Sequence, residues 1–256
     1  MKPSIRSTHL LAAALIALGS SAASAATLAD FEAPGSLTSW VTWGDVSLQH
    51  GNTALPDAAE GVALLALTTA STEYEDDYPA TAGAFNLSGT AALDASAANG
   101  LATSLGLGPN GLDSGAAFAF EGSAASISFS ASAGSTLSLR WNLLSTDTLF
   151  DDTAFVLLDG QRIDLATALQ ATQAVGGAYA AGGQTGWQTT TITLSHGGTV
   201  QLSFGIVDHD DAAGTSALLV DDVSVTPAIP EPKAWMLMSA GLALMGAAAA
   251  RRRDRR

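Results

Sequence analysis

The sequence contains no cysteine, so the chain forms no disulfide bond and has no thiolate nucleophile or thiolate metal ligand. The H-E-x-x-H and G-x-S-x-G motifs of metalloproteases and α/β-hydrolases are also missing. His50, His196 and His209 lie far apart in the sequence. We therefore predict a non-catalytic protein whose fold depends on its apolar core or on bound metal.

Basic residues are almost missing from the middle of the chain. Between residues 26 and 228 only Arg140 and Arg162 are basic, whereas 22 of the 24 acidic residues lie there, all except Glu231 and Asp254. Such a negative surface repels nucleic acid and offers oxygen ligands to a hard cation such as Ca²⁺. We expect no nucleic-acid partner.

The first 25 residues have the pattern of an export signal. Lys2 and Arg6 precede an apolar run over residues 10–18, and small residues follow up to an Ala-x-Ala pattern that ends at Ala25. This order is typical of a secretory signal peptide. We predict export through the secretion translocon, with a mature protein that starts near Ala26.

Residues 234–250 are apolar and uncharged, and they run into a basic cluster over residues 251–256 that includes Arg251, Arg252 and Arg253. This pattern predicts a transmembrane helix with a basic stop and places the middle of the chain outside the cytoplasm. As a helix the segment is about 25 Å long, less than the ~30 Å hydrocarbon core, so Trp235 and the arginines would reach for the interfaces. Its shortness favours a transient inner-membrane anchor. A buried core helix is the alternative.

Apolar residues alternate with Ser, Thr or Gln through much of the middle of the chain. Half-buried strands have this period of two. Clear examples occupy residues 126–131, 137–143 and 200–206. Only residues 164–175, with Asp164 as N-cap, offer a helix, so a parallel α/β fold is disfavoured. We predict an all-β, two-sheet antiparallel sandwich of jelly-roll type, with a closed barrel as the alternative.

Three other groups in the middle are candidates for loops or sites. Residues 72–82, which are acidic, and residues 91–115, which are rich in Gly, Ala and Ser, are predicted as exposed loops, the second with loose backbone. Two clusters could bind a cation or simply be wet turns: Asp147, Asp151 and Asp152, and Asp208, Asp210 and Asp211. Six aromatic residues could stack on a sugar or lie in the core: Trp40, Trp43, Tyr74, Tyr78, Tyr179 and Trp187.

The tail joins three features in order: Pro230-Glu231-Pro232, the apolar segment 234–250, and the arginines. The two prolines deny helix, so this strip would leave the bilayer extended and open to a protease. A rigid linker is the alternative. The tail resembles a PEP-CTERM sorting signal. That resemblance implies recognition by exosortase near the Pro-Glu-Pro, in a Gram-negative bacterium that makes exopolysaccharide.

The ends of the β domain carry a second resemblance. Asp30-Phe31-Glu32 opens the first expected strand, and residues 218–225, which contain Asp221 and Asp222, form the last. The pair is similar to the terminal strands of carbohydrate-binding-module-like jelly rolls. The resemblance implies that these strands lie side by side and that Glu32 and Asp222 share a structural Ca²⁺, with Asp30 and Asp221 as neighbours. Wet turn carboxylates are the alternative.

These patterns divide the chain into a signal peptide (1–25), an acidic β domain (26–228) and a sorting tail (229–256). Our first hypothesis is a surface or extracellular-matrix protein, associated with exopolysaccharide or biofilm, that exosortase processes from an inner-membrane-anchored precursor. The second hypothesis is a Ca²⁺-stabilised module that binds exopolysaccharide. A secreted glycan-active enzyme is the third.

Overall fold

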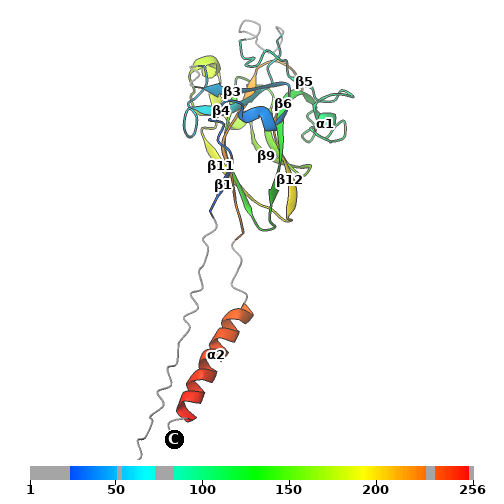
Figure 1. Cartoon of the computed structure of the whole chain (residues 1–256). Coiled ribbons are helices and arrows are strands. Elements are labelled where there is room, and N and C mark those ends of the chain that lie inside the picture. The colour runs from blue at the N-terminus through cyan, green and yellow to red at the C-terminus, as the bar shows by residue number, and fades with distance from the viewer. Residues whose placement is uncertain (1–23, 51–53, 73–83, 229–233, 254–256) are drawn as a thin grey trace, which may run out of the picture.

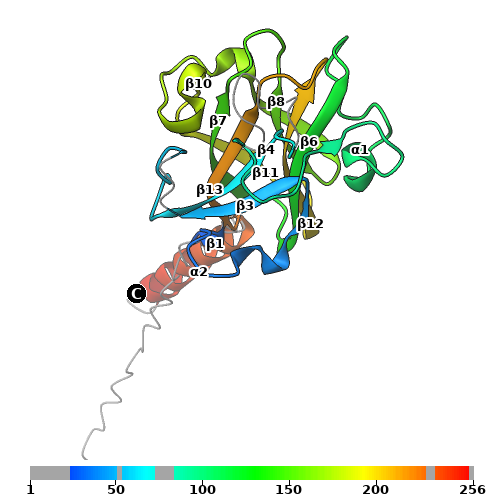
Figure 2. The same ribbon diagram turned by 90° about the horizontal axis from the view of Figure 1, so that it is seen from above.

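The computed structural model of the chain describes residues 24–50, 54–72, 84–228 and 234–253. In these residues, strands form two sheets that face each other (Figure 1, Figure 2). One sheet has seven strands and the other six, and every pairing between strands is antiparallel. The prediction of an all-β, two-sheet antiparallel sandwich is therefore confirmed, and the alternative of a single closed barrel is wrong.

The seven-stranded sheet has the order β10-β7-β13-β4-β3, with β1 beside β13 and β11 beside β7. Its strands are β1 (Ala26–Ala29), β3 (Asp45–His50), β4 (Ala63–Thr68), β7 (Thr136–Ser145), β10 (Gly183–Gln184), β11 (Gln188–Thr193) and β13 (Ser216–Thr226).

The six-stranded sheet has the order β2-β6-β12-β8-β9, with β5 beside β6. Its strands are β2 (Val41–Trp43), β5 (Leu93–Asp94), β6 (Ala119–Ala131), β8 (Thr153–Leu158), β9 (Gln161–Thr167) and β12 (Gly198–His209). The helices are α1 (Leu101–Ser104), α2 (Ala234–Arg253) and three short 3₁₀ turns, η1 (Ser36–Ser39), η2 (Ala168–Gln170) and η3 (Gly177–Ala181).

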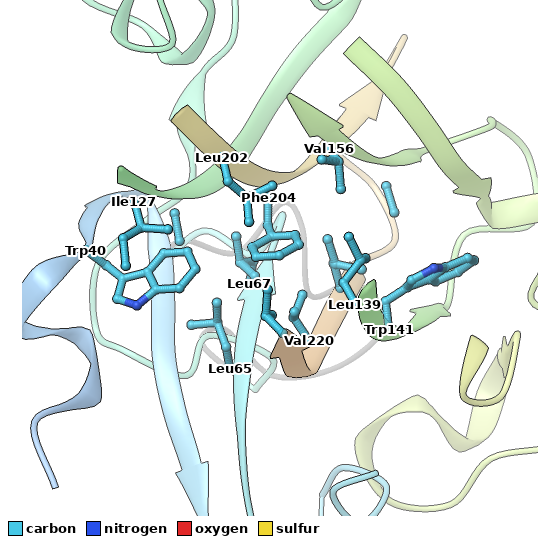
Figure 3. Packing of buried hydrophobic residues seen from close by; sticks show 14 of the residues in the cluster. Trp40, Leu65, Leu67, Ile127, Leu139, Trp141, Val156, Leu202, Phe204 and Val220 are labelled. Carbon is cyan, nitrogen blue, oxygen red and sulfur yellow. The ribbon is translucent and has the colours of Figure 1, made fainter. Parts of the chain in front are cut away.

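The main core lies between the two sheets and is built from the alternating residues of the long strands. Leu139 and Trp141 of β7 face Leu202 and Phe204 of β12 across the interior (Figure 3). Trp40 stacks on Phe204 with ring centroids 5.9 Å apart. Each such side chain contributes about 1.5–3 kcal/mol by leaving water. Nine of the 23 buried residues of this core lie in the three strand segments that the alternation predicts most clearly.

Strands β4 and β8 are buried on both faces, which explains their continuous apolar sequences. In β4, Leu65 points into the main core, whereas Leu64 joins a second cluster outside the seven-stranded sheet. In β8, Val156 points inward, whereas Phe155 joins a third cluster outside the six-stranded sheet. A strand with such a run must be covered on both sides.

The segment that covers β8 was predicted as a loose loop, and that prediction is wrong. Residues 91–115 include β5 and α1, and Leu101 and Leu112 pack with Phe155 in the third cluster. Both leucines are almost completely buried. The segment is rich in Gly, Ala and Ser, so its few large apolar residues gave no clear sign of burial.

The helix predicted over residues 164–175 is also absent. Asp164 lies in β9, where it pairs with Phe155 of β8, and only the 3₁₀ turn η2 follows. Thr167 caps that turn through a capping box with Gln170. Strand β12 pairs with one edge of β8 and leaves the other edge open. Residues 161–167 pair with that open edge as β9, so they form a strand and not an α-helix.

The sandwich has two ends of different character. At one end, which we call the proximal end, β1 begins beside the last residues of β13, with Ala26 opposite Val225 (Figure 1). The other, distal end holds the loop after β7 and the loop before β13, because Ser145 pairs with Ser216. At ~3.3 Å per residue, β13 separates the two ends by about 30 Å.

Helix α2 includes the apolar segment that was predicted to span a membrane, and it ends with Arg251, Arg252 and Arg253. Within the described residues, no helix combines the length and apolar character that a membrane crossing requires. The predicted transmembrane helix is therefore not supported. The physical reason is that the uncharged apolar stretch over residues 234–250 is short for crossing a bilayer.

Candidate metal centre

Two aspartate-rich loops, which the sequence presented as separate candidates, meet at the distal end. The loop over residues 146–152 crosses from β7 in one sheet to β8 in the other, and the loop over residues 210–215 crosses from β12 back to β13. Thr153 pairs with Val207. This register sets the preceding Asp152 beside the following Asp208.

A third carboxylate completes the cluster. One ligand oxygen from each of Asp147, Asp152 and Asp208 lies within 4.8 Å of the others. Their side chains are buried, with exposed fractions of 8 %, 0 % and 1 %. Among the described residues this is the one set of three or more acidic or histidine side chains whose ligand atoms converge in this way.

Hydrogen bonds fix one side of the cluster. Ser216 Oγ donates to Asp152 Oδ2 at 2.5 Å and also bonds Ser145 Oγ at 2.8 Å. The amide of Leu149 donates to Asp147 Oδ1 at 2.7 Å. Asp147 Oδ2 and Asp208 Oδ1 are buried and have no hydrogen-bond partner among the described residues. Each such orphan acceptor costs roughly 1–3 kcal/mol.

The electrostatics of the cluster follow from burial and like charge. Burial raises the pKa of Asp152 to about 7, and hydrogen bonds from Ser216 and Asp208 oppose that shift. Burial, and then the neighbouring charge of Asp152, raise the pKa of Asp208 far above its usual range. Three carboxylates this close repel one another unless protons or a cation neutralise them.

The neighbouring histidine does not join the cluster through its ring. His209 Nε2 lies 3.2 Å from the carbonyl oxygen of Leu112, on the other side of the strand from the carboxylates. Burial lowers the pKa of this imidazole, so it is neutral at physiological pH. The converging ligand atoms are thus all oxygens, a set that suits a hard cation.

Two of the predicted calcium ligands, Glu32 and Asp221, accept hydrogen bonds from backbone amides. Glu32 Oε1 accepts the amides of Val62 and Ala63, both at 2.9 Å, and these bonds lower the pKa of Glu32. Asp221 Oδ2 accepts the amide of Glu60 at 2.8 Å. Both carboxylates therefore hold the turn that leads into β4.

The remaining two predicted ligands lie near the same strands. Asp30 is exposed and accepts the amide of Glu32 at 3.3 Å. Asp222 has a positive φ of 44° at an irregularity of β13. The four residues do not converge as a ligand set in the described part of the chain, so calcium at this position stays a prediction.

The predicted sorting residues lie mostly beyond what the structure describes. Pro230, Glu231 and Pro232 are outside the described residues, as are residues 1–23 of the expected signal peptide. Trp235 belongs to α2, which also carries the first three arginines. Exosortase recognition therefore stays a prediction from the sequence.

The candidate aromatic residues do not form a sugar-binding strip in the described residues. Trp40 and Tyr179 are buried, in the main core and in the second cluster. Trp43 and Trp187 are half-buried against the third and second clusters. Tyr74 and Tyr78 lie outside the described residues.

A comparison with protein-family models and a comparison with curated proteins each found no match. Among solved structures, this chain is similar to TmCBM61 in complex with β-1,4-galactotriose. The likeness covers 75 % of this chain and 90 % of that chain, with 11 % sequence identity and a TM-score of 0.35. At this distance it carries no statement about function.

Proposed function

We propose that the chain is an exported, non-catalytic protein of the cell surface or extracellular matrix of a Gram-negative bacterium, processed by exosortase at its tail. The observation that carries this proposal is the ordered tail, in which Pro230-Glu231-Pro232, an apolar segment and an arginine cluster follow the last strand. The near absence of basic residues between the two ends agrees with a domain outside the cytoplasm.

The arrangement of the two ends of the sandwich supports display on a surface. The first strand begins at Ala26 next to the end of β13, so a leader and a tail would both attach at the proximal end. The distal loops then lie about 30 Å away from the attachment point. A tethered domain of this shape presents its distal end to the surroundings.

Burial of the paired carboxyls favours a non-catalytic role. Glycoside hydrolysis needs two carboxyl groups that flank a bound sugar. Asp152 and Asp208 are a close pair, but they are 0 % and 1 % exposed. A substrate has no access to them in this arrangement.

The absence of cysteine makes the display testable with one substitution. Leu149 is 79 % exposed at the distal end, so Leu149→Cys gives the chain a single thiol without disturbing the core. We expect a membrane-impermeant maleimide to label this variant on intact cells of the native host, and the cysteine-free wild type to give no signal. Labelling that occurs only after the cells are lysed would contradict surface display.

A carbohydrate-binding module is the second candidate, favoured by a pocket beside β3 and β4. This cavity of about 220 Å³ is lined by Gln49, Pro56 and Asp57 among others. The half-buried Trp187 donates its indole N–H to the carbonyl oxygen of Asp57 at 3.0 Å, which fixes the pocket wall. Polar side chains in a concave, partly apolar pocket are suited to the hydroxyl groups of a sugar.

This second function predicts retardation of the protein in a gel that contains the exopolysaccharide of its host. The double variant Gln49→Ala/Asp57→Ala should migrate freely, whereas Asp30→Ala, which removes an exposed carboxylate at the proximal end, should still be retarded. Equal migration of all three proteins with and without polysaccharide would eliminate the pocket as a glycan site.

A further inference from the structure

We propose that Asp147, Asp152 and Asp208 form a calcium site that ties together the two loops at the distal end. This site is distinct from the predicted one at Glu32 and Asp222. Its function is structural: one cation would join the crossing from β7 to β8 to the crossing from β12 to β13.

Charge is the first argument for a bound cation. The charged groups that act on Asp208 are all acidic, namely Asp152, Asp211 and Glu121. None of the leading charge effects on Asp152 or Asp208 comes from an arginine. Several buried carboxyls without a cationic side chain are unfavourable unless a metal ion or protons compensate them.

Unsatisfied oxygens are the second and independent argument. Asp208 is only 1 % exposed, and its Oδ1 has no hydrogen-bond partner among the described residues. Asp147 Oδ2 is in the same state. Buried polar atoms in folded proteins are nearly always paired, so two orphan acceptors on one cluster indicate a missing ligand.

Ligand chemistry and spacing favour Ca²⁺. Ca²⁺ binds oxygen at about 2.3–2.6 Å, so two oxygens on opposite sides of one ion lie roughly 4.6–5.2 Å apart. The oxygens of this cluster lie within 4.8 Å of one another. Zn²⁺ is disfavoured because the cluster contains neither a histidine ring nor a cysteine. Mg²⁺ binds oxygen at about 2.0–2.1 Å in a strict octahedron, which three carboxylates on two loops fit less well.

The test titrates the full-length chain, stripped with EDTA, with CaCl₂ in a calorimeter and follows its thermal unfolding. We expect one Ca²⁺ per chain and a higher unfolding midpoint, with a smaller shift for equal MgCl₂. Asp147→Asn and Asp208→Asn should each weaken Ca²⁺ binding at least tenfold. The matched controls Glu32→Gln and Asp222→Asn should leave it within twofold of the wild type.

A second measurement needs no variant and so remains decisive if a variant fails to fold. On the wild-type chain, Ca²⁺ should slow amide hydrogen exchange in residues 146–152 and 210–215 and leave the turn before β4 unchanged. The proposal is overturned if the wild type binds no Ca²⁺, or if binding and protection follow Glu32 and Asp222 instead of the three aspartates.

Discussion

Asp45 and Asp208 are both fully buried acids, yet their surroundings differ. Asp45 accepts the hydroxyl of Thr68 at 2.5 Å and the amides of Leu87 and Ser88 at 2.9 and 2.6 Å. Asp208 Oδ1 has no such partner. Hydrogen-bond donors around a buried carboxylate stabilise its negative charge. A buried carboxylate without such donors needs a proton or a cation to neutralise it.

Replacing Asp45 should therefore be costly. Asp45→Ala leaves the buried Thr68 hydroxyl and the two amides of the 87–88 turn without their acceptor. Since a buried unsatisfied group costs roughly 1–3 kcal/mol, we expect a loss of about 3 kcal/mol in the free energy of unfolding. Urea denaturation measures it, with Asp30→Ala as the exposed control. A loss below about 1 kcal/mol would contradict this account.

Glu32 gives a prediction about pH. Its folded-state pKa lies below the ordinary value of 4.5 because it accepts two amides of the turn before β4. A lowered pKa means that the stabilisation is fully present above pH 4.5 and is lost as the pH falls through the folded-state value. Glu32→Gln should thus lower the denaturation midpoint at pH 7, and the difference from the wild type should shrink progressively as the pH falls below 4.5. A difference that stays the same as the pH falls would show that charge is not the cause.

The sequence could not select the important acids among the 22 in the domain. The aspartates of the two distal loops were visible as candidates, but their convergence depends on the pairing of β8 with β12 and of β7 with β13. Those registers join residues 44 to 90 positions apart. Glu32 and Asp222 were predicted as calcium ligands because of a resemblance. In the fold, the carboxylate of Glu32 instead accepts hydrogen bonds from the amides of Val62 and Ala63.

Strands whose apolar residues alternate were predictable, and strands without alternation were the harder case. The residues of β7 and β12 that were expected to be apolar and inward all lie in the main core. The runs in β4 and β8 gave no period, because both faces are covered. The covering segments are poor in large apolar residues, so composition alone classed residues 91–115 as loose.

The contact between β12 and β8 leaves no room for a side chain at one position. A Cβ added to Gly205 would lie 2.2 Å from the ring of Phe155. Overpacking of this kind costs about 1–3 kcal/mol, so Gly205→Ala should lower the unfolding free energy by that amount. Chemical denaturation measures the loss.

Two further variants test the cause of this loss. The added Phe155→Leu should recover part of the stability, because the ring that collides is removed. Gly108→Ala, where a Cβ meets nothing within 4 Å, is the matched control and should be neutral. If Gly205→Ala unfolds at the same denaturant concentration as the wild type, the close approach of the strands is not as described.

The whole molecule is an acidic sandwich whose first strand begins beside the end of its last strand. The pairing of Ala26 with Val225 brings the beginning and the end of the sandwich together, and the aspartate cluster lies at the opposite end. Without disulfides, the domain depends on its three apolar clusters. The calcium site we propose would stabilise the distal end.

The proposed function requires that the tail is a sorting signal that is removed during export. The most direct test is the intact mass of the protein recovered from the outside of its native host, grown with and without exosortase. We expect a chain that starts near Ala26 and ends near Pro230, and we expect this trimming to fail without the enzyme or in Pro230→Ala/Pro232→Ala. If the mass includes the tail through Arg256 in every case, the Pro-Glu-Pro strip is a linker and the proposed sorting is wrong.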